Sequence, residues 1–262
     1  METVQLKQDT LLAYEEHIRE AEAAMERALR EDNPFLWSDG CAERTRQVRE
    51  GLTIAQLWPG NGPIKVPDGL IHDWIGATCI SGTTIEKTIA LIQDYDNHKN
   101  IYKPEVISSK LISRHGGDFQ IYLRLLKKKI ITVVLDTDHN VHYSRLDSTR
   151  SCCRSYTTRI AEVEDAGKPT ERARPPDTGH GFLWRLNSYW RFLERDGSVY
   201  VECRAISLSR NVPKGLGWMI EPIIEKLPRE SLRATLEATR QALSSKPGQT
   251  PISSACYTSA HK

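Results

Sequence analysis

Hydrophobic and polar residues alternate with a period of two through most of the middle of the chain, and this pattern predicts β-strands. Short turn sequences separate the alternating stretches, among them Gly116-Gly117 and Asp196-Gly197. Strands joined in this way pair as antiparallel hairpins. We expect strands at residues 48–58, 69–80, 106–115, 118–126, 130–146, 148–163, 182–195 and 198–209. We expect a tight turn at Lys127-Lys128-Lys129 and a surface loop over residues 168–181.

Three other segments repeat apolar residues every three or four positions, the spacing of a helix with one buried face. The first is residues 5–31, which contain no Gly or Pro and which we expect to pack on their own chain rather than on a partner. A second helix follows Thr83-Thr84, where either threonine can serve as N-cap. The third covers residues 215–243, with a kink or break expected at Pro228, which has no N–H to donate.

The segment GFLWRLNSYWRF (181–192) precedes Asp196-Gly197, a strong signal for a two-residue hairpin turn that sets the register of the flanking strands. On one face large residues oppose small ones, in the pairs Phe192–Val201, Trp190–Cys203, Ser188–Ala205 and Leu186–Ser207. On the other face the pairs are Leu193–Tyr200, Arg191–Glu202 and Tyr189–Arg204. We expect this second face to be wet, with a cross-strand ion pair and a cation–π pair.

The aromatic face of this hairpin has two interpretations. Trp184, Leu186, Trp190 and Phe192 either fill an ordinary core or form one wall of a ligand pocket. An ordinary core is the more common arrangement, and the pocket interpretation rests on the small residues opposite the rings, since a covering helix rarely closes such a space completely.

Composition narrows the function without fixing it. The chain has 262 residues and a formal net charge of +2, whereas proteins that follow a nucleic-acid backbone usually carry a large basic excess, so we expect no nucleic-acid partner. No apolar stretch is long enough to span a bilayer, and METVQLKQDT lacks the pattern of a signal peptide. We therefore expect a cytoplasmic protein, and an exported form with a missing leader stays open.

Motifs for metal, nucleotide or nucleophilic chemistry are absent from the sequence. The six cysteines form no C-x-x-C pair, so we expect no metal site and no cofactor. Neither G-x-S-x-G, H-E-x-x-H nor a P-loop occurs, so we assign no catalytic residue. Acid–base chemistry would have to come from inward-pointing polar side chains, for which the candidates are His72, Asp73, Arg124, Asp136, His142 and Arg185.

The chain resembles the START/Bet v1-like superfamily, also called the polyketide cyclase/SRPBCC group, over roughly residues 48–245. GLIHDWIGATCISGTTIEKTIALI (69–92) looks like its first long strand and the following helix, and ALIQDYDNHKNIYKPEVISSKLI (90–112) like its helix-to-strand passage. Residues 215–243 look like its C-terminal helix. The resemblance implies an α+β helix-grip fold, a curved antiparallel sheet wrapped around a long C-terminal helix. We expect residues 1–33 to form an additional helix, 34–245 the helix-grip domain and 246–262 a disordered tail.

Members of this superfamily bind lipids, sterols, isoprenoids or polyketides between the sheet and the helix, so the resemblance implies a hydrophobic or amphipathic small-molecule ligand. We expect a carrier or sensor of such a ligand. Two alternatives stay open: a cyclase- or dehydratase-like enzyme, and an interaction protein with a closed core that docks through residues 5–31. Peripheral membrane contact through the lysine triplet is also conceivable, and the oligomeric state stays open. The cavity candidates are Trp74, Tyr95, Arg124, His142, Trp184, Leu186, Trp190, Phe192, Cys203, Ala205, Trp218, Ile220 and Ile223.

Overall fold

A computed structural model describes residues 2–30, 33–58, 62–128, 132–211 and 217–244, with side chains in the last range from residue 227 onward. The strands are β1 (Val4–Gln5), β2 (Ile54–Leu57), β3 (Ile64–Val66), β4 (Gly69–Ser81), β5 (Val106–His115), β6 (Asp118–Lys128), β7 (Thr132–Arg145), β8 (Arg150–Glu164), β9 (Arg172–Ala173), β10 (Thr178–Gly179), β11 (Arg185–Arg195) and β12 (Ser198–Arg210). The helices are α1 (Gln8–Arg30), η1 (Trp37–Gly40), α2 (Ala42–Arg49), α3 (Ile85–Gln93), η2 (Tyr95–Asn97), α4 (His98–Ile101) and α5 (Gly217–Ser244).

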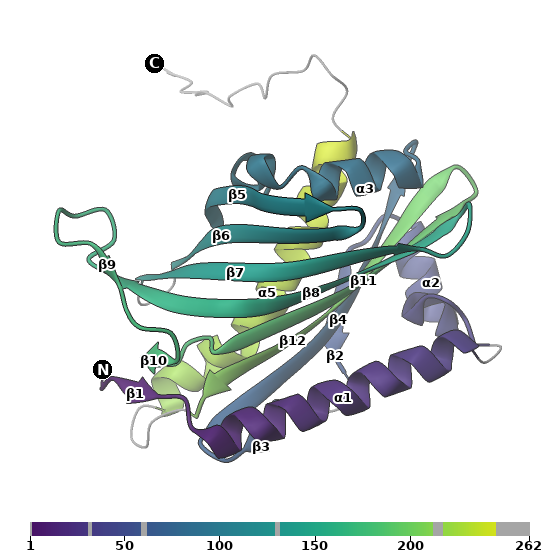
Figure 1. Ribbon diagram of the computed structural model, residues 1–262. Coiled ribbons are helices and arrows are strands. Elements are labelled where there is room, and N and C mark those ends of the chain that lie inside the picture. Colours follow the sequence, from purple (N-terminus) through teal and green to yellow (C-terminus); the bar gives the residue numbers. More distant parts are fainter. Residues whose placement is uncertain (1, 31–32, 59–61, 129–131, 212–216, 245–262) are drawn as a thin grey trace, which may run out of the picture.

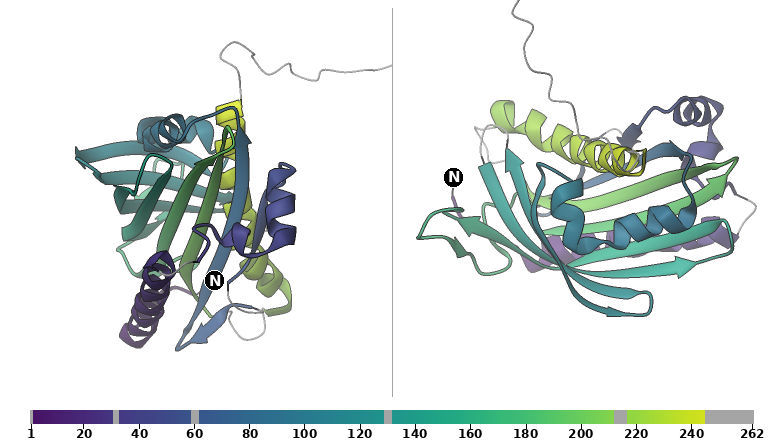
Figure 2. Two further views of the ribbon diagram at one scale, coloured as in Figure 1. Left: turned by 90° about the vertical axis from the view of Figure 1, so that its right-hand side faces the viewer. Right: turned by 90° about the horizontal axis from the view of Figure 1, so that it is seen from above.

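A curved antiparallel sheet of ten strands forms the centre of the molecule, in the order β2-β4-β12-β11-β8-β7-β6-β5, with β3 beside β4 and β9 beside β8 (Figure 1). The long helix α5 and the shorter α3 lie on one side of this sheet, and α1 lies on the other (Figure 2). The helix-grip fold predicted from the sequence, with its additional N-terminal helix, is therefore confirmed. The register predicted from Asp196-Gly197 is also confirmed, since Trp190 pairs with Cys203 and Arg195 with Ser198.

Helix α5 packs closely on the inner face of the sheet, the face that curves toward it. Leu232 and Leu236 join the main core cluster with Trp74 of β4. Gly76 allows this approach, because a Cβ there would come within 2.9 Å of the Leu236 side chain and within 2.8 Å of the Ile54 carbonyl oxygen. The break expected at Pro228 is wrong: α5 is one continuous helix, since packing of its apolar side outweighs a single lost hydrogen bond.

The outer face of β11 and β12 is largely buried beneath α1 and the η1–α2 segment, so the prediction of a wet face on these two strands is wrong. Tyr14 of α1 donates a hydrogen bond to the Ile206 carbonyl (3.0 Å), and Tyr189 donates to Glu22 of α1 (2.9 Å). The apolar side of α1 therefore packs on its own chain, as expected from the sequence. The sequence pattern of β11 and β12 did not reveal this second cover, because the polar outer residues find their partners within the protein.

Two of those outer residues illustrate how the polar groups are satisfied. Arg204 binds both carboxylate oxygens of Asp73 on β4, at 2.9 and 2.6 Å, instead of contacting Tyr189 as an exposed cation. Glu202 is buried near η1 and accepts a hydrogen bond from the Ser38 amide (3.3 Å). The polar groups on this face are therefore buried and hydrogen-bonded within the protein, and water does not solvate them.

Of the local predictions from the sequence, one helix cap is confirmed, and one strand, one turn and one loop differ in the structure. Thr84 caps α3 through the Lys87 amide (3.4 Å), as one of the two options predicted. Within the segment 48–58, only Ile54–Leu57 is strand, because the preceding AERTRQVR consists largely of good helix formers and forms α2. Lys127 and Lys128 are the last residues of β6 rather than a turn, and Lys129 lies outside the described residues. The loop 168–181 contains the short strands β9 and β10.

The three-part division at residues 33 and 245 stays a prediction, and the expected tail, 246–262, lies outside the described residues. Within the described part of the chain, the helices lack the combination of length and apolar composition that crossing a membrane requires.

Candidate functional site

A cavity of about 640 Å³ lies between the inner face of the sheet and α5. Its walls come from β4–β8, β11, β12, the α3–α4 segment and α5. Most of the wall is apolar, and its aliphatic members include Ile92, Val106, Ile121, Leu123, Leu125, Val133, Leu135, Val141, Leu186, Leu227 and Leu232. Such walls with a few polar groups are typical of small-molecule sites.

The exposure of side chains along β11 shows that the side chains which the structure describes do not fill this cavity. The residues facing the cavity, Leu186, Ser188 and Trp190, are only partly buried although they lie in the middle of the sheet. Their neighbours Asn187 and Tyr189, which face α1, are buried. The aromatic side of the hairpin is therefore the less tightly covered one, the reverse of the sequence-based expectation.

Five of the predicted cavity residues line this space, and all belong to β11, β12 or η2. They are Tyr95, Leu186, Trp190, Cys203 and Ala205. Whether they contact a ligand stays a prediction. The side chains of Trp218, Ile220 and Ile223 lie outside the described residues.

Two further candidates belong to the solid core beside the cavity. Phe192 is fully buried and stacks on Trp190 with ring centroids 6.2 Å apart, so it packs beside the cavity wall without lining it. Trp74 is buried in the same cluster, and its indole N–H has no hydrogen-bond partner among the described residues.

Three candidates lie on the other side of the sheet or outside the cavity. Trp184 packs in the cluster beneath α1, because it precedes the first residue of β11 and does not follow the alternation of that strand. Arg124 binds Asp136 (2.7 and 3.0 Å) and Glu171 (2.8 Å) on the outer face. His142 contacts Asp118 (2.6 Å) and lines a separate groove near the β5–β6 turn.

Several polar residues of the cavity wall were missed as candidates. They are His98, His139, Tyr143, Ser155, Ser188, Ser207 and Ser209, whereas His72 was named only for acid–base chemistry. The alternation on β7 contained a usable signal: Val133, Leu135, Val141 and Tyr143 share one face, and His139 has the same parity. His142, the predicted cavity residue on this strand, has the opposite parity.

The three histidines of the cavity wall are neutral near pH 7. Burial lowers the pKa of His72 and of His98 to about 4 in each case. Burial also lowers the pKa of His139 to about 4, and the nearby His98 lowers it further. No net positive charge therefore resides on these rings, and each ring offers one N–H donor and one nitrogen acceptor.

A hydrogen-bonded pair of tyrosines forms another polar spot on the wall. The hydroxyl oxygens of Tyr95 and Tyr143 lie 2.8 Å apart. Burial raises the pKa of both hydroxyls, and it raises the pKa of the neighbouring Cys153 thiol to about 12. All three groups stay protonated and neutral, which makes Cys153 a poor nucleophile.

Charged residues gather where the cavity meets solvent. Lys103 is exposed although it lines the cavity, and Glu105 and Lys127 beside it are partly buried. The Lys127 ammonium contacts the Glu105 carboxylate and donates to Ser231 of α5 (2.6 Å). The cavity thus has a charged mouth between β5, β6 and α5, and a neutral interior. Lys127 therefore lies at the mouth of the cavity, and the prediction that it lies at an exposed hairpin tip is wrong.

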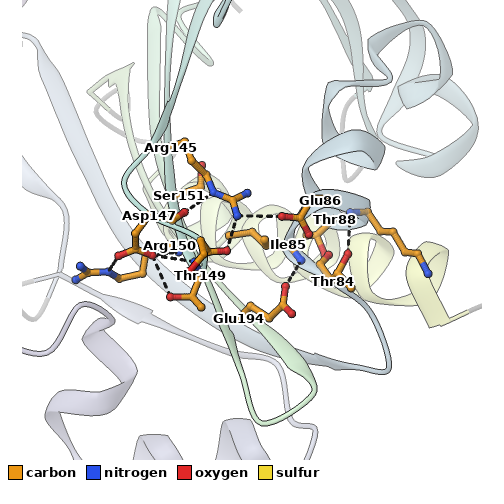
Figure 3. A network of polar contacts seen from close by, with 12 residues as sticks. Thr84, Ile85, Glu86, Thr88, Arg145, Asp147, Thr149, Arg150, Ser151 and Glu194 are labelled. Atoms are coloured by element: carbon orange, nitrogen blue, oxygen red, sulfur yellow. Dashed lines mark hydrogen bonds and ion pairs between the residues drawn. The ribbon is translucent and has the colours of Figure 1, made fainter.

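Helix α3, which supplies Ile92 to the wall, is tied to the sheet by a polar network (Figure 3). Arg145 of β7 donates to Glu86 (2.9 Å), and Glu194 of β11 accepts from the Ile85 amide (2.7 Å). Asp147 organises the β7–β8 turn by accepting from the amides of Thr149 and Arg150, both at 2.8 Å. The network holds α3 in place at the end of the sheet opposite α1's N-terminus.

Comparison with known proteins identifies structural likenesses at low sequence identity. No protein-family model matches the sequence, and no curated protein matches it. Among solved structures, the chain is similar to TTHA0849 from Thermus thermophilus (15% identity, 64% of this chain and 94% of that chain, TM-score 0.46). It is also similar to a STAR-related lipid transfer protein from Xanthomonas axonopodis (14% identity, 70% and 99%, TM-score 0.46). A third is the Zhui aromatase/cyclase from Streptomyces sp. R1128 (10% identity, 66% and 93%, TM-score 0.42).

Proposed function

We propose that this protein binds a hydrophobic or amphipathic small molecule in the cavity beneath α5 and carries or senses it. The observation that carries the proposal is the cavity of about 640 Å³ with largely apolar walls. Protein interiors are otherwise packed as densely as organic crystals, and voids larger than a water molecule are few. A space of this size lies within the range of small-molecule pockets and far above that of packing defects.

The volume limits the class of ligand. At roughly 30 Å³ per non-hydrogen atom, the share of a molecule in liquid water, the cavity holds about 20 such atoms. A single acyl or isoprenoid chain, or a fused-ring skeleton of the polyketide or sterol type, fits this number. A phospholipid with two acyl chains has more than about twice as many atoms, so only part of it would fit.

Filling the cavity tests the proposal. Ala205 lines the cavity and pairs with Ser188 of β11, so Ala205→Phe places a ring inside the cavity. We expect uptake of the neutral probe N-phenyl-1-naphthylamine, followed by its fluorescence, to weaken at least tenfold. The matched control is Ala173→Phe, which adds the same ring at an exposed position of β9.

The outcome is read alongside circular dichroism, which must show that both variants are folded. Equal probe uptake by wild type, Ala205→Phe and Ala173→Phe would contradict a ligand site in the cavity. Extraction of the purified wild-type protein with organic solvent, followed by mass spectrometry, then identifies any bound molecule.

An enzyme of the cyclase or dehydratase type is the second candidate, and one observation favours it. His139 and Ser155 both line the cavity, so an acid–base pair stands inside an apolar site. The pKa of about 4 nevertheless makes His139 a weak base near neutral pH, where general bases work best with a pKa near the operating pH. Binding therefore ranks above catalysis. Loss of water from an aliphatic β-hydroxyketone, detected by enone absorbance and absent in His139→Gln, would reverse this order.

A further inference from the structure

Three polar side chains of the cavity wall stand together away from its charged mouth. His139 of β7 and Ser155 of β8 are neighbours on the sheet, and His98 of α4 lies close to His139. His98 and His139 are buried and Ser155 is partly buried. The hydrogen bonds that these groups make inside the protein decide what they can offer to a ligand.

The protonation of His139 is fixed by its neighbour Thr137. The Thr137 hydroxyl donates its only hydrogen to the Leu123 carbonyl (3.0 Å). The contact between Thr137 Oγ1 and His139 Nε2 (2.9 Å) must then be donated by Nε2. The neutral ring therefore carries its hydrogen on Nε2 and leaves Nδ1 as a hydrogen-bond acceptor.

His98 follows the same rule. Its Nε2 lies 2.8 Å from the Ile92 carbonyl oxygen, which can only accept, so Nε2 carries the hydrogen. Tyr95 and Tyr102 hold the ring between them, with ring centroids 4.8 Å away in both cases. Among the described residues, none donates a hydrogen bond to Nδ1 of His98. Two nitrogen acceptors are thus present in one part of the wall.

Ser155 adds a donor next to these acceptors. Its Oγ lies 3.5 Å from Nδ1 of His139, which is long for a hydrogen bond between these atoms. A hydroxyl oxygen placed beside the pair could donate its hydrogen to Nδ1 and accept the hydrogen of Ser155. An ether oxygen could use only the serine, and a carboxylate would bring a second set of lone pairs and an uncompensated buried charge.

We propose that His139, Ser155 and His98 form a recognition site for a neutral hydroxyl group, so that the cavity prefers alcohols or phenols to ethers and esters of equal size. The proposal rests on the ligand-binding function proposed above and names the class of ligand. Carboxylic acids are a poor test, because their anionic group can stay at the mouth near Lys103 while the chain enters the cavity.

Isomeric probes isolate the hydroxyl. Tetradecan-1-ol and 1-methoxytridecane have the same atoms and differ in having or lacking an O–H donor. Displacement of bound N-phenyl-1-naphthylamine near neutral pH gives the dissociation constant of each. We expect the alcohol to bind about tenfold more tightly, the effect of one buried hydrogen bond.

Variants then locate the preference. His139→Gln retains an amide nitrogen near the Nε2 position, so donation to Thr137 continues, but it loses the Nδ1 acceptor; we expect the alcohol preference to fall at least threefold. His139→Asn places its amide oxygen near the Nδ1 position and should keep the preference. His142→Gln, on the same strand but outside the cavity, is the matched control and should behave as wild type.

Each outcome decides the matter. Equal binding of alcohol and ether by the wild type overturns the hydroxyl site while leaving a ligand cavity in place. A preference that persists in both His139→Gln and His98→Gln overturns the assignment of these residues, and His98→Gln also decides if His139→Gln does not fold. Failure of the wild type to take up N-phenyl-1-naphthylamine overturns this site together with the proposed function.

Discussion

The carboxyl group of Glu202 lies beneath η1, where its ionisation should weaken the fold as the pH rises. The residue is 4% exposed. Burial raises its pKa from 4.5 to about 7, although the amides of Trp37 and Ser38 and the charge of Arg191 act in the opposite direction. The strand pattern paired Glu202 with Arg191 as a surface ion pair, but Arg191 donates to the Phe35 carbonyl (2.7 Å). The burial of Glu202 is thus only partly compensated.

The direction and size follow from the two pKa values. A folded-state pKa above the unfolded one means that the neutral carboxyl stabilises the fold relative to the ionised one. That stability is fully present below about pH 4.5 and is lost progressively until the pH passes about 7. At 1.36 kcal/mol for each pKa unit, the full loss is roughly 3 kcal/mol.

Glu202→Gln removes the ionisation and keeps an acceptor for the Ser38 amide. We expect the variant to be more stable than wild type by roughly 3 kcal/mol at pH 8 and by less than about 1 kcal/mol at pH 5. Urea unfolding followed by tryptophan fluorescence between pH 4.5 and pH 8 measures the difference. Glu15→Gln, at an exposed position of α1, should show no such trend. A difference between Glu202→Gln and wild type that does not change with pH refutes the reasoning.

Two stability predictions concern the covers of the sheet. Asp73→Asn leaves the buried Arg204 without its carboxylate partner, so it should lower the free energy of unfolding by about 3–5 kcal/mol. Denaturant titration measures this loss. A loss below about 1 kcal/mol would mean that water compensates the Arg204 charge. Gly76→Ala forces a methyl group between β2 and α5 and should lower the free energy of unfolding by about 1–3 kcal/mol. Gly62→Ala adds a Cβ that has no other atom within 4 Å, so it should change this free energy by less than about 0.5 kcal/mol. Equal effects of the two substitutions would contradict the close packing at Gly76.

The helix-grip architecture was predicted from the order of the elements and the family resemblance, whereas the register of β11 and β12 could be predicted because it is encoded locally. Asp196 and Gly197 adopt positive φ angles of 55° and 70°, as a two-residue hairpin turn requires, and this fixes every pair of β11 and β12. Side-chain alternation then sorts the two faces. Neither step depends on any other part of the chain.

The exposure of the two faces could not be predicted in the same way. Tyr189 and Arg204 read as surface residues until Glu22 of α1 and Asp73 of β4 are brought to them, and those partners are far away in the sequence. Trp184 was assigned to the wrong face because the start of a strand is the least certain part of such a pattern. His139 could have been found from the parity of β7, and the Thr137 contact that fixes its protonation could not.

The two covers of β11 also separate two sets of mutations. Leu186, Ser188 and Trp190 contact the cavity, whereas Asn187 and Tyr189 between them face α1. These three cavity positions can therefore be exchanged to reshape the cavity without disturbing the packing of α1. A single-residue insertion into β11 would exchange the two sets and damage both layers at once. The strand should therefore tolerate substitutions at its cavity positions but not insertions or deletions.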